Sequence, residues 1–170
     1  SRKIRRNLRH KMEEGELLIR GFYGYKKEGN RLIVDEVTAP IVKRVFDLYL
    51  KGHGFRSIAR IFNGEGIPTP SKYYNNLNKP VATAWVAQHV RRIVTGEVYT
   101  GCMVSGTTEK VSFKSEKTRR KPKDEWIRIE NHHEAIIDRE TFDVAQEMVS
   151  KKRTFAPKAR VPSLLSLYTR

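Results

Sequence analysis

Apolar residues recur at helical spacing in the stretch around residues 83–95. Four of them fall at positions i, i+4, i+7 and i+8, which places them on one face of a helix. They are Val86, Val90, Ile93 and Val94. We predict that this helix begins at Thr83, because a threonine hydroxyl can accept a hydrogen bond from an unpaired amide in the first turn. The apolar stripe is expected to pack inward.

The opposite face of the same predicted helix is small, polar and basic. Glutamine and arginine can make paired hydrogen bonds to adenine and guanine edges, and small residues let a helix approach a surface closely. We therefore predict that this face lies in the major groove of DNA. The residues concerned are Thr83, Ala84, Ala87, Gln88, Arg91, Arg92 and Thr95. The alternative is an ordinary amphipathic helix whose outer face contacts only water.

A second helix is predicted just before this one, at about residues 55–63. Ile58, Ile61 and Phe62 form its apolar stripe, and the glycines and prolines of residues 64–70 end it. Gly54 stands at its N-cap. Two short helices around a turn, the second with a basic outer face, match the helix-turn-helix layout, which we assign to residues 54–101. A polar insertion over residues 71–80 makes the turn unusually long.

The remaining patterns predict supporting elements. A helix over residues 38–50 closes a three-helix core with the other two, through Val42, Val45, Phe46 and Tyr49. A short hairpin is predicted over residues 26–34, beside Tyr25, which we expect to pack against the core rather than stack on bases. Residues 102–104 and 126–129 are expected to pair as strands, and a helix over residues 138–152 follows. The predicted fold class is α+β, with a helix-turn-helix three-helix core, small antiparallel β-hairpins and a C-terminal helix.

The charge balance indicates a polyanionic partner. Lys and Arg number 34 against 19 Asp and Glu, which gives a formal net charge of +15. Basic side chains outside the groove-facing helix are expected to contact the DNA backbone or the minor groove. They are Arg2, Arg5, Arg6, Arg9, Arg20, Lys72, Lys117, Arg119 and Arg120. Two regions have a solvated alternative: residues 1–14 form either a basic arm or a charged helix end, and residues 105–123 form either a phosphate clamp or a solvated loop.

Several classes of function are not supported. No apolar run is long enough to span a bilayer and no secretory signal is visible, so a cytoplasmic location without membrane binding is expected. The single cysteine, Cys102, excludes an internal disulfide and a cysteine-rich zinc site. Adjacent His132 and His133 have poor spacing for a metal, and His133 is expected to hydrogen-bond where a strand meets the last helix. No catalytic constellation is found, so no catalytic residue and no cofactor is assigned to this chain.

Several separate motifs, taken in order, resemble the recombinase domain of the large serine recombinases. They are GFYGYKK, VTAPIVKRVFDLYLKGHGFRSIARIFNGEGIPTP, WVAQHVRRIVTGEVYTG and HHEAIIDRETFDVAQEMV, and the resemblance covers about residues 3–152. The family includes phage serine integrases and resolvase-type transposon recombinases. The resemblance implies that the helix from Thr83 lies in the major groove and that residues 15–22 cross the minor groove. Family members usually have Ser or Thr where this chain has Gly54.

The same resemblance implies a layout. Residues 1–14 are the end of a long connecting helix, residues 15–153 the DNA-binding recombinase domain, and residues 154–170 a linker toward a zinc-ribbon domain. Zinc is therefore expected only in that downstream domain. The catalytic serine domain would precede this chain, so the chain is expected to bind double-stranded DNA without cutting it. The parent would assemble as a dimer or tetramer on DNA through the absent domains, and would integrate or excise a mobile element.

Two other functions remain open from the residues. A stand-alone helix-turn-helix transcriptional regulator would need a dimerisation element, and none is evident in the sequence. An RNA-binding basic protein would prefer structured RNA to duplex DNA, which a competition experiment can test.

Overall fold

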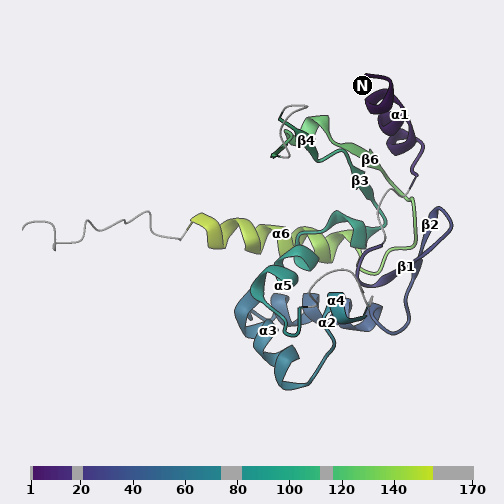
Figure 1. Ribbon diagram of the computed structural model, residues 1–170. Helices are drawn as coiled ribbons and strands as arrows, with labels where there is room; N and C mark the ends of the chain where they lie inside the picture. Colours follow the sequence, from purple (N-terminus) through teal and green to yellow (C-terminus); the bar gives the residue numbers. More distant parts are fainter. Residues whose placement is uncertain (1, 17–20, 74–81, 112–116, 155–170) are drawn as a thin grey trace, which may run out of the picture.

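The computed structural model describes residues 2–16, 21–73, 82–111 and 117–154. It is an α+β structure of helices and small antiparallel strand pairs, as the sequence predicts (Figure 1). The helices are α1 (Arg2–Glu13), α2 (Ala39–Leu50), α3 (Phe55–Gly64), α4 (Pro70–Tyr73), α5 (Ala87–Val94) and α6 (Arg139–Thr154), with 3-10 turns η1 (Glu97–Thr100) and η2 (Lys123–Glu125). The strands are β1 (Tyr25–Glu28), β2 (Arg31–Val34), β3 (Met103–Ser105), β4 (Thr108–Lys110), β5 (Thr118–Arg120) and β6 (Ile127–Ile129).

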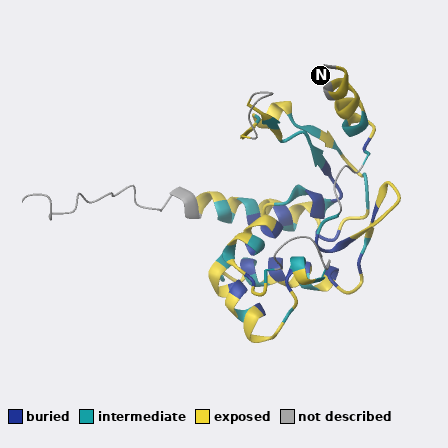
Figure 2. Ribbon diagram, in the orientation of Figure 1, coloured by how far each residue is buried: buried dark blue, intermediate teal, exposed yellow. Residues whose placement is uncertain are grey.

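Helices α2, α3 and α5 pack against one another, and α6 packs across α2 and α5. The predicted inward stripe of α2 is fully buried, and Ile58 and Phe62 of α3 are buried as well. Gly54 stands at the N-cap of α3, as predicted. In Figure 2 the buried residues concentrate in these helices and in the nearby strand β1. Burial of about two dozen apolar side chains here supplies most of the driving force for folding.

The β1–β2 hairpin packs against the helical group through Tyr25 and Leu32. Its register pairs Tyr25 with Val34 and Glu28 with Arg31, so Gly29 and Asn30 form a two-residue turn. Gly29 has φ +58°, a conformation that glycine adopts without strain. Tyr25 is completely buried, and its hydroxyl donates to the carbonyl oxygen of Glu134 at 2.9 Å. The prediction that Tyr25 packs in the core is therefore confirmed.

The second half of the chain builds an arm of paired strands. Strands β3 and β6 pair antiparallel, as predicted, with Met103 opposite Ile129. The stretch between them is not simply a loop, because β4 and β5 form a further ladder within it. Threonine favours extended structure, and opposite charges face each other across this ladder at Glu109 and Arg119. The expectation of an irregular segment over residues 105–123 was wrong for these strands.

Helix α1 lies beside this arm, near β6 (Figure 1). Gly15 follows it with φ +78°, and the imidazole Nε2 of His132 lies 3.0 Å from the carbonyl oxygen of Gly15. Ile4 and Leu8, on the apolar stripe of α1, are 62% and 42% exposed. The helix is thus attached to the rest of the protein mainly at its C-terminal end.

Candidate nucleic-acid interface

Helix α5 begins three residues later than predicted, with its N-cap at Val86 rather than Thr83. Residues 83–86 are not helical, and Val86, at the N-cap, has an extended backbone with ψ 159°. The reason is Trp85, whose indole is 2% exposed and must enter the core between α3 and the linker after α1. Thr83 is therefore not the N-cap, and Val86 is 49% exposed rather than inward. The other three apolar residues of the stripe are buried as predicted.

An interlock between α3 and the start of α5 fixes this geometry. The Asn63 side chain accepts a hydrogen bond from the Trp85 backbone N–H at 2.7 Å and donates one to the Trp85 carbonyl at 2.9 Å. The indole Nε1 donates to the carbonyl oxygen of Ile67 at 3.0 Å. The sequence pattern missed both Asn63 and Trp85. An aromatic residue preceding an amphipathic helix was the only available signal for this interlock.

His89, rather than Thr83, supplies a side-chain contact at the start of the helix. Its Nδ1 lies 3.4 Å from the backbone nitrogen of Val86 and can accept a hydrogen bond from it when the imidazole is neutral. Burial, and to a lesser extent the nearby charge of Arg92, lowers the pKa of His89 below its ordinary value. The neutral form is thus favoured near pH 7, and it is the form that caps the helix.

The outer face of α5 is solvent-exposed. Gln88, Arg91, Arg92 and Thr95 are exposed and Ala87 is half-buried. Thr83 and Ala84 are exposed too, but they lie in the extended segment before the helix. The structure therefore brings five of the seven predicted groove residues together on α5 or at its C-cap. The other two, Thr83 and Ala84, lie in the segment before the helix.

A cleft of about 830 Å³ opens beside this face. One wall is α5, another is α6, and the third is formed by β5, η2 and Trp126. Arg120 comes into this cleft from β5, so one predicted backbone contact lies next to the predicted groove residues. Arg119, its neighbour in sequence, instead pairs with Glu109 at 2.6 Å.

The other predicted backbone contacts are dispersed. Arg6 is exposed on α1, where Arg9 pairs with Glu13 at 2.9 Å. Lys72 is exposed on α4 and Lys117 just before β5. Arg20 and the side chains of Arg2 and Arg5 lie outside the described residues, as do residues 74–80 of the predicted insertion and residues 155–170 of the predicted linker. The described members of this predicted set thus lie on α1, on α4 and in or beside β5.

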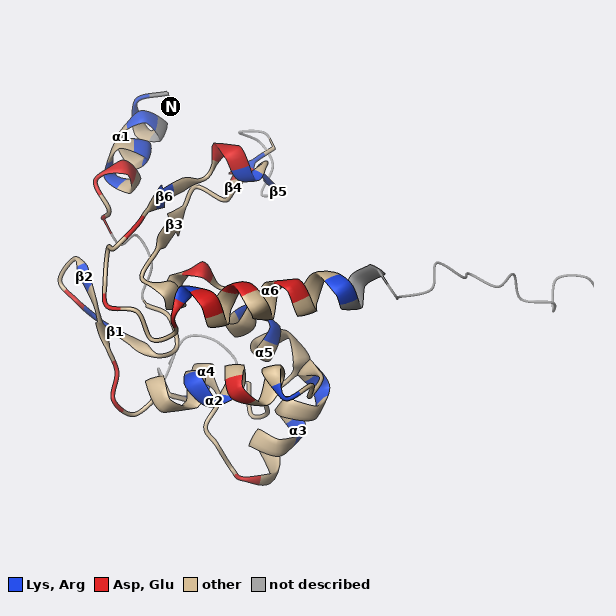
Figure 3. Ribbon diagram, turned by 180° about the vertical axis from the view of Figure 1, so that it is seen from behind, with Lys and Arg blue, Asp and Glu red and all other residues tan. Residues whose placement is uncertain are grey.

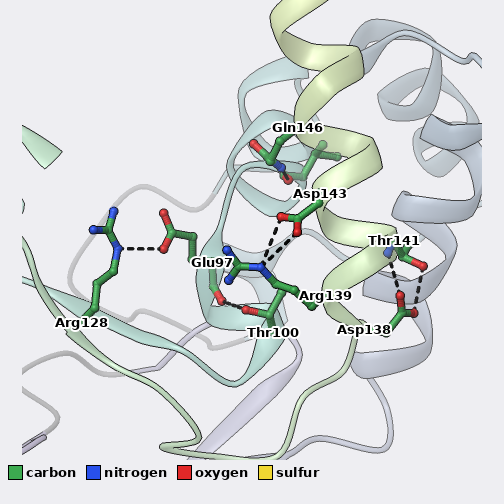
Figure 4. Close-up of polar contacts among 9 residues, drawn as sticks. Glu97, Thr100, Arg128, Asp138, Arg139, Thr141, Asp143 and Gln146 are labelled. Carbon is green, nitrogen blue, oxygen red and sulfur yellow. Dashed lines mark hydrogen bonds and ion pairs between the residues drawn. The ribbon is translucent and has the colours of Figure 1, made fainter.

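Acidic side chains restrict the basic surface on the side of α6. Figure 3, seen from behind, shows Asp and Glu along α6, where Glu140, Asp143 and Glu147 lie. Figure 4 shows one contact that attaches this helix to α5 and one that attaches the arm to η1: Gln146 donates to the Val94 carbonyl at 2.7 Å, and Arg128 pairs with Glu97 at 3.1 Å. Asp138, where this helix was predicted to begin, caps the first turn of α6 by accepting from the Thr141 N–H at 2.7 Å.

The histidine pair has a structural role. His133 Nε2 donates to the carbonyl oxygen of Val98 at 2.7 Å, which agrees with its expected role as a hydrogen-bonding residue near the last helix. Among the residues that the structure describes, no group of three or more His, Cys, Asp or Glu side chains is placed to hold a metal ion. No helix in the described ranges is long and apolar enough to cross a membrane.

Comparison with known proteins places the chain in a family. The Recombinase family model matches residues 36–152, so the chain belongs to the Recombinase family. The resemblance to the recombinase domain of the large serine recombinases (LSRs) is thereby confirmed. The structure is also similar to a crystal structure of an LSR–DNA complex, with a TM-score of 0.58 and 17% identity over 90% of this chain.

A second similar structure comes from work on the sequence requirements of the Listeria innocua prophage attP site. It has a TM-score of 0.48 and 20% identity over 89% of this chain. The chain spans 39% of the length of the first of these solved chains and 52% of the second.

Proposed function

We propose that this chain is the sequence-specific, double-stranded-DNA-binding part of a site-specific serine recombinase. Helices α3 and α5 act as a helix-turn-helix unit, with α5 in the major groove. The observation that carries the proposal is the outer face of α5, where Gln88 and Arg91 are exposed on a helix whose other face is fixed in the core. Family membership and the similarity in fold to an LSR–DNA complex support it.

Within this proposal the two kinds of contact have different tasks. Gln88 and Arg91 read base edges, each good paired contact giving about 1–3 kcal/mol of discrimination. The basic side chains on α1 and Arg120 of β5 contact phosphates and so fix the position of the domain on the duplex. The catalytic serine domain and a zinc-ribbon domain belong to the parent protein, before and after this chain, and assembly on DNA occurs through them.

The experiment is a fluorescence-anisotropy titration on a duplex obtained by selection from random sequences, beside an unrelated duplex. Arg91→Ala is expected to weaken binding to the selected duplex more than to the unrelated one, because the lost contact reads a base. Arg31→Ala, on the distant hairpin, is the matched control and should change neither. Equal losses on both duplexes would contradict the assignment of Arg91 to base reading.

Two further measurements separate DNA binding from its alternatives. If about six phosphates are neutralised, affinity for duplex should fall roughly a thousandfold between about 50 and 200 mM salt. Structured RNA should compete poorly with duplex DNA, because its narrow major groove cannot admit α5. RNA competing better than duplex would refute the proposal.

A further inference from the structure

The basic residues around the cleft beside α5 fall into two groups. Three form an ion pair with an acidic neighbour: Arg119 pairs with Glu109, Lys121 with Glu125 and Arg128 with Glu97. Within the described ranges, no ion pair to a carboxylate is formed by the other group, which consists of Arg91, Arg92, Arg120 and Lys123. Unpaired guanidinium groups facing one cleft repel each other, and an anion between them relieves that repulsion.

Arg92 and Arg120 share a special position within this second group. Both line the 830 Å³ cleft, and both also line a neighbouring cleft of about 700 Å³ that reaches Phe22 and Tyr23 of the linker after α1. They therefore lie where the two clefts meet, one on α5 and the other on β5. A chain of phosphates that passes from one cleft to the other must pass these two residues.

Trp126 orients the Arg120 side chain. The Arg120 guanidinium carbon lies 4.9 Å from the centre of the Trp126 ring, within the range of a cation–π contact. The ring itself is fixed, because its Nε1 donates to the carbonyl oxygen of Lys121 at 3.0 Å and Arg128 lies 5.4 Å from its centre. Successive residues of a strand point to opposite faces, so Arg119 points to Glu109 while Arg120 points to Trp126.

We propose that Arg92 and Arg120 form a two-sided site for one phosphodiester of the DNA backbone, and that Trp126 is the positioning residue that holds Arg120 in it. This inference rests on the proposed function and deepens it, since it names a backbone contact beside the groove occupied by α5. The site is independent of sequence, because phosphates carry no base information. An arginine already stacked on a fixed ring loses less freedom on binding than a free one, which favours the contact.

The test compares Arg120→Ala with Arg119→Ala, its neighbour on the same strand, in anisotropy titrations at several salt concentrations. Arg120→Ala should weaken binding about tenfold or more on the selected and the unrelated duplex alike, because a charged hydrogen bond to phosphate is lost. The slope of log affinity against log salt should fall by about 1. Arg119→Ala, whose charge is already neutralised, should leave the slope within error of the wild type.

Trp126 is tested through Arg120. Trp126→Leu should reproduce the Arg120→Ala loss, Trp126→Phe should retain much of the binding, and Trp126→Leu should add nothing in the Arg120→Ala background. If Trp126→Leu fails to fold by circular dichroism, the comparison of Trp126→Phe with wild type, alone and with Arg120→Ala, still tests the coupling.

Three outcomes would overturn the site: an unchanged salt slope in Arg120→Ala, equal effects of Arg119→Ala and Arg120→Ala, or independent effects of Trp126 and Arg120. In that case, if Arg91→Ala still weakens binding to the selected duplex more than binding to the unrelated one, only the phosphate site is refuted and the proposed function stands. Failure of the wild-type protein to bind any duplex would overturn both this site and the proposed function.

Discussion

Replacing Asn63 with alanine tests the interlock that sets the start of α5. The change removes two hydrogen bonds, of 2.7 and 2.9 Å, to the backbone of Trp85. Each such bond stabilises the folded state by about 0.5–1.5 kcal/mol, so together they contribute about 1–3 kcal/mol. Alanine is a better helix former than asparagine by about 0.5 kcal/mol, which offsets part of the loss. We expect Asn63→Ala to lower the free energy of unfolding by about 1–2 kcal/mol.

The assay is urea denaturation followed by tryptophan fluorescence, because Trp85 lies at the perturbed position. Arg60→Ala, an exposed change on the same helix, is the matched control and should stay within about 0.5 kcal/mol of the wild type. Asn63→Asp keeps an acceptor for the Trp85 N–H but loses the donor to the Trp85 carbonyl. Its urea midpoint should therefore fall between those of Asn63→Ala and Arg60→Ala. Equal midpoints for Asn63→Ala and Arg60→Ala would refute the interlock as a stabilising feature.

Three further changes test the packing and titration of the core. Gly24→Ala should lower the free energy of unfolding, measured by urea denaturation, by roughly 2–5 kcal/mol, because the residue has φ +99° and an added Cβ would lie 2.9 Å from two buried side chains. Gly29→Ala is the control: its added Cβ would meet no neighbouring atom, so the free energy of unfolding should fall by only about 1 kcal/mol. Tyr25→Phe should lower the free energy of unfolding by about 0.5–1.5 kcal/mol, because it removes the hydroxyl that donates to the Glu134 carbonyl, while the Val98 carbonyl keeps its hydrogen bond from His133. Burial lowers the pKa of His133, so the unfolded chain binds more protons as the pH falls. The stability that the neutral His133 side chain contributes is complete above about pH 6.5 and is lost as the pH falls through the folded-state pKa. The urea midpoint of the wild type should therefore drop on acidification, and the midpoint of His133→Gln should drop by less.

Periodicity predicted the helices well where one face is continuously apolar. Helix α2 has a stripe of large apolar residues spaced for one face, and nothing in it competes with helix formation. Helix α6 likewise begins at a good capping residue, Asp138. In both helices, local sequence and tertiary packing favour the same conformation, so a single sequence contains the information needed.

The start of α5 could not be predicted in this way. Thr83 is a good cap by local chemistry, yet a buried tryptophan two residues later prevents the helix from beginning there. The partner that holds Trp85 is Asn63, 22 residues away, and a window of helical length cannot include both. The β4–β5 ladder was missed for a related reason: its strands are only three residues long, and they are charged rather than alternately apolar.

The orientation of α5 is set from outside the helix. With eight residues it is too short to be stable alone, because helices under about 12 residues are marginal in water. Asn63 holds the chain just before its first turn, and Gln146 of α6 binds the Val94 carbonyl in its last turn (Figure 4). The angle of the exposed face therefore depends on α3 and α6 rather than on α5 itself. Changes at Asn63 or Gln146 should then alter how Gln88 and Arg91 meet a groove, even though neither residue lies on the outer face of α5.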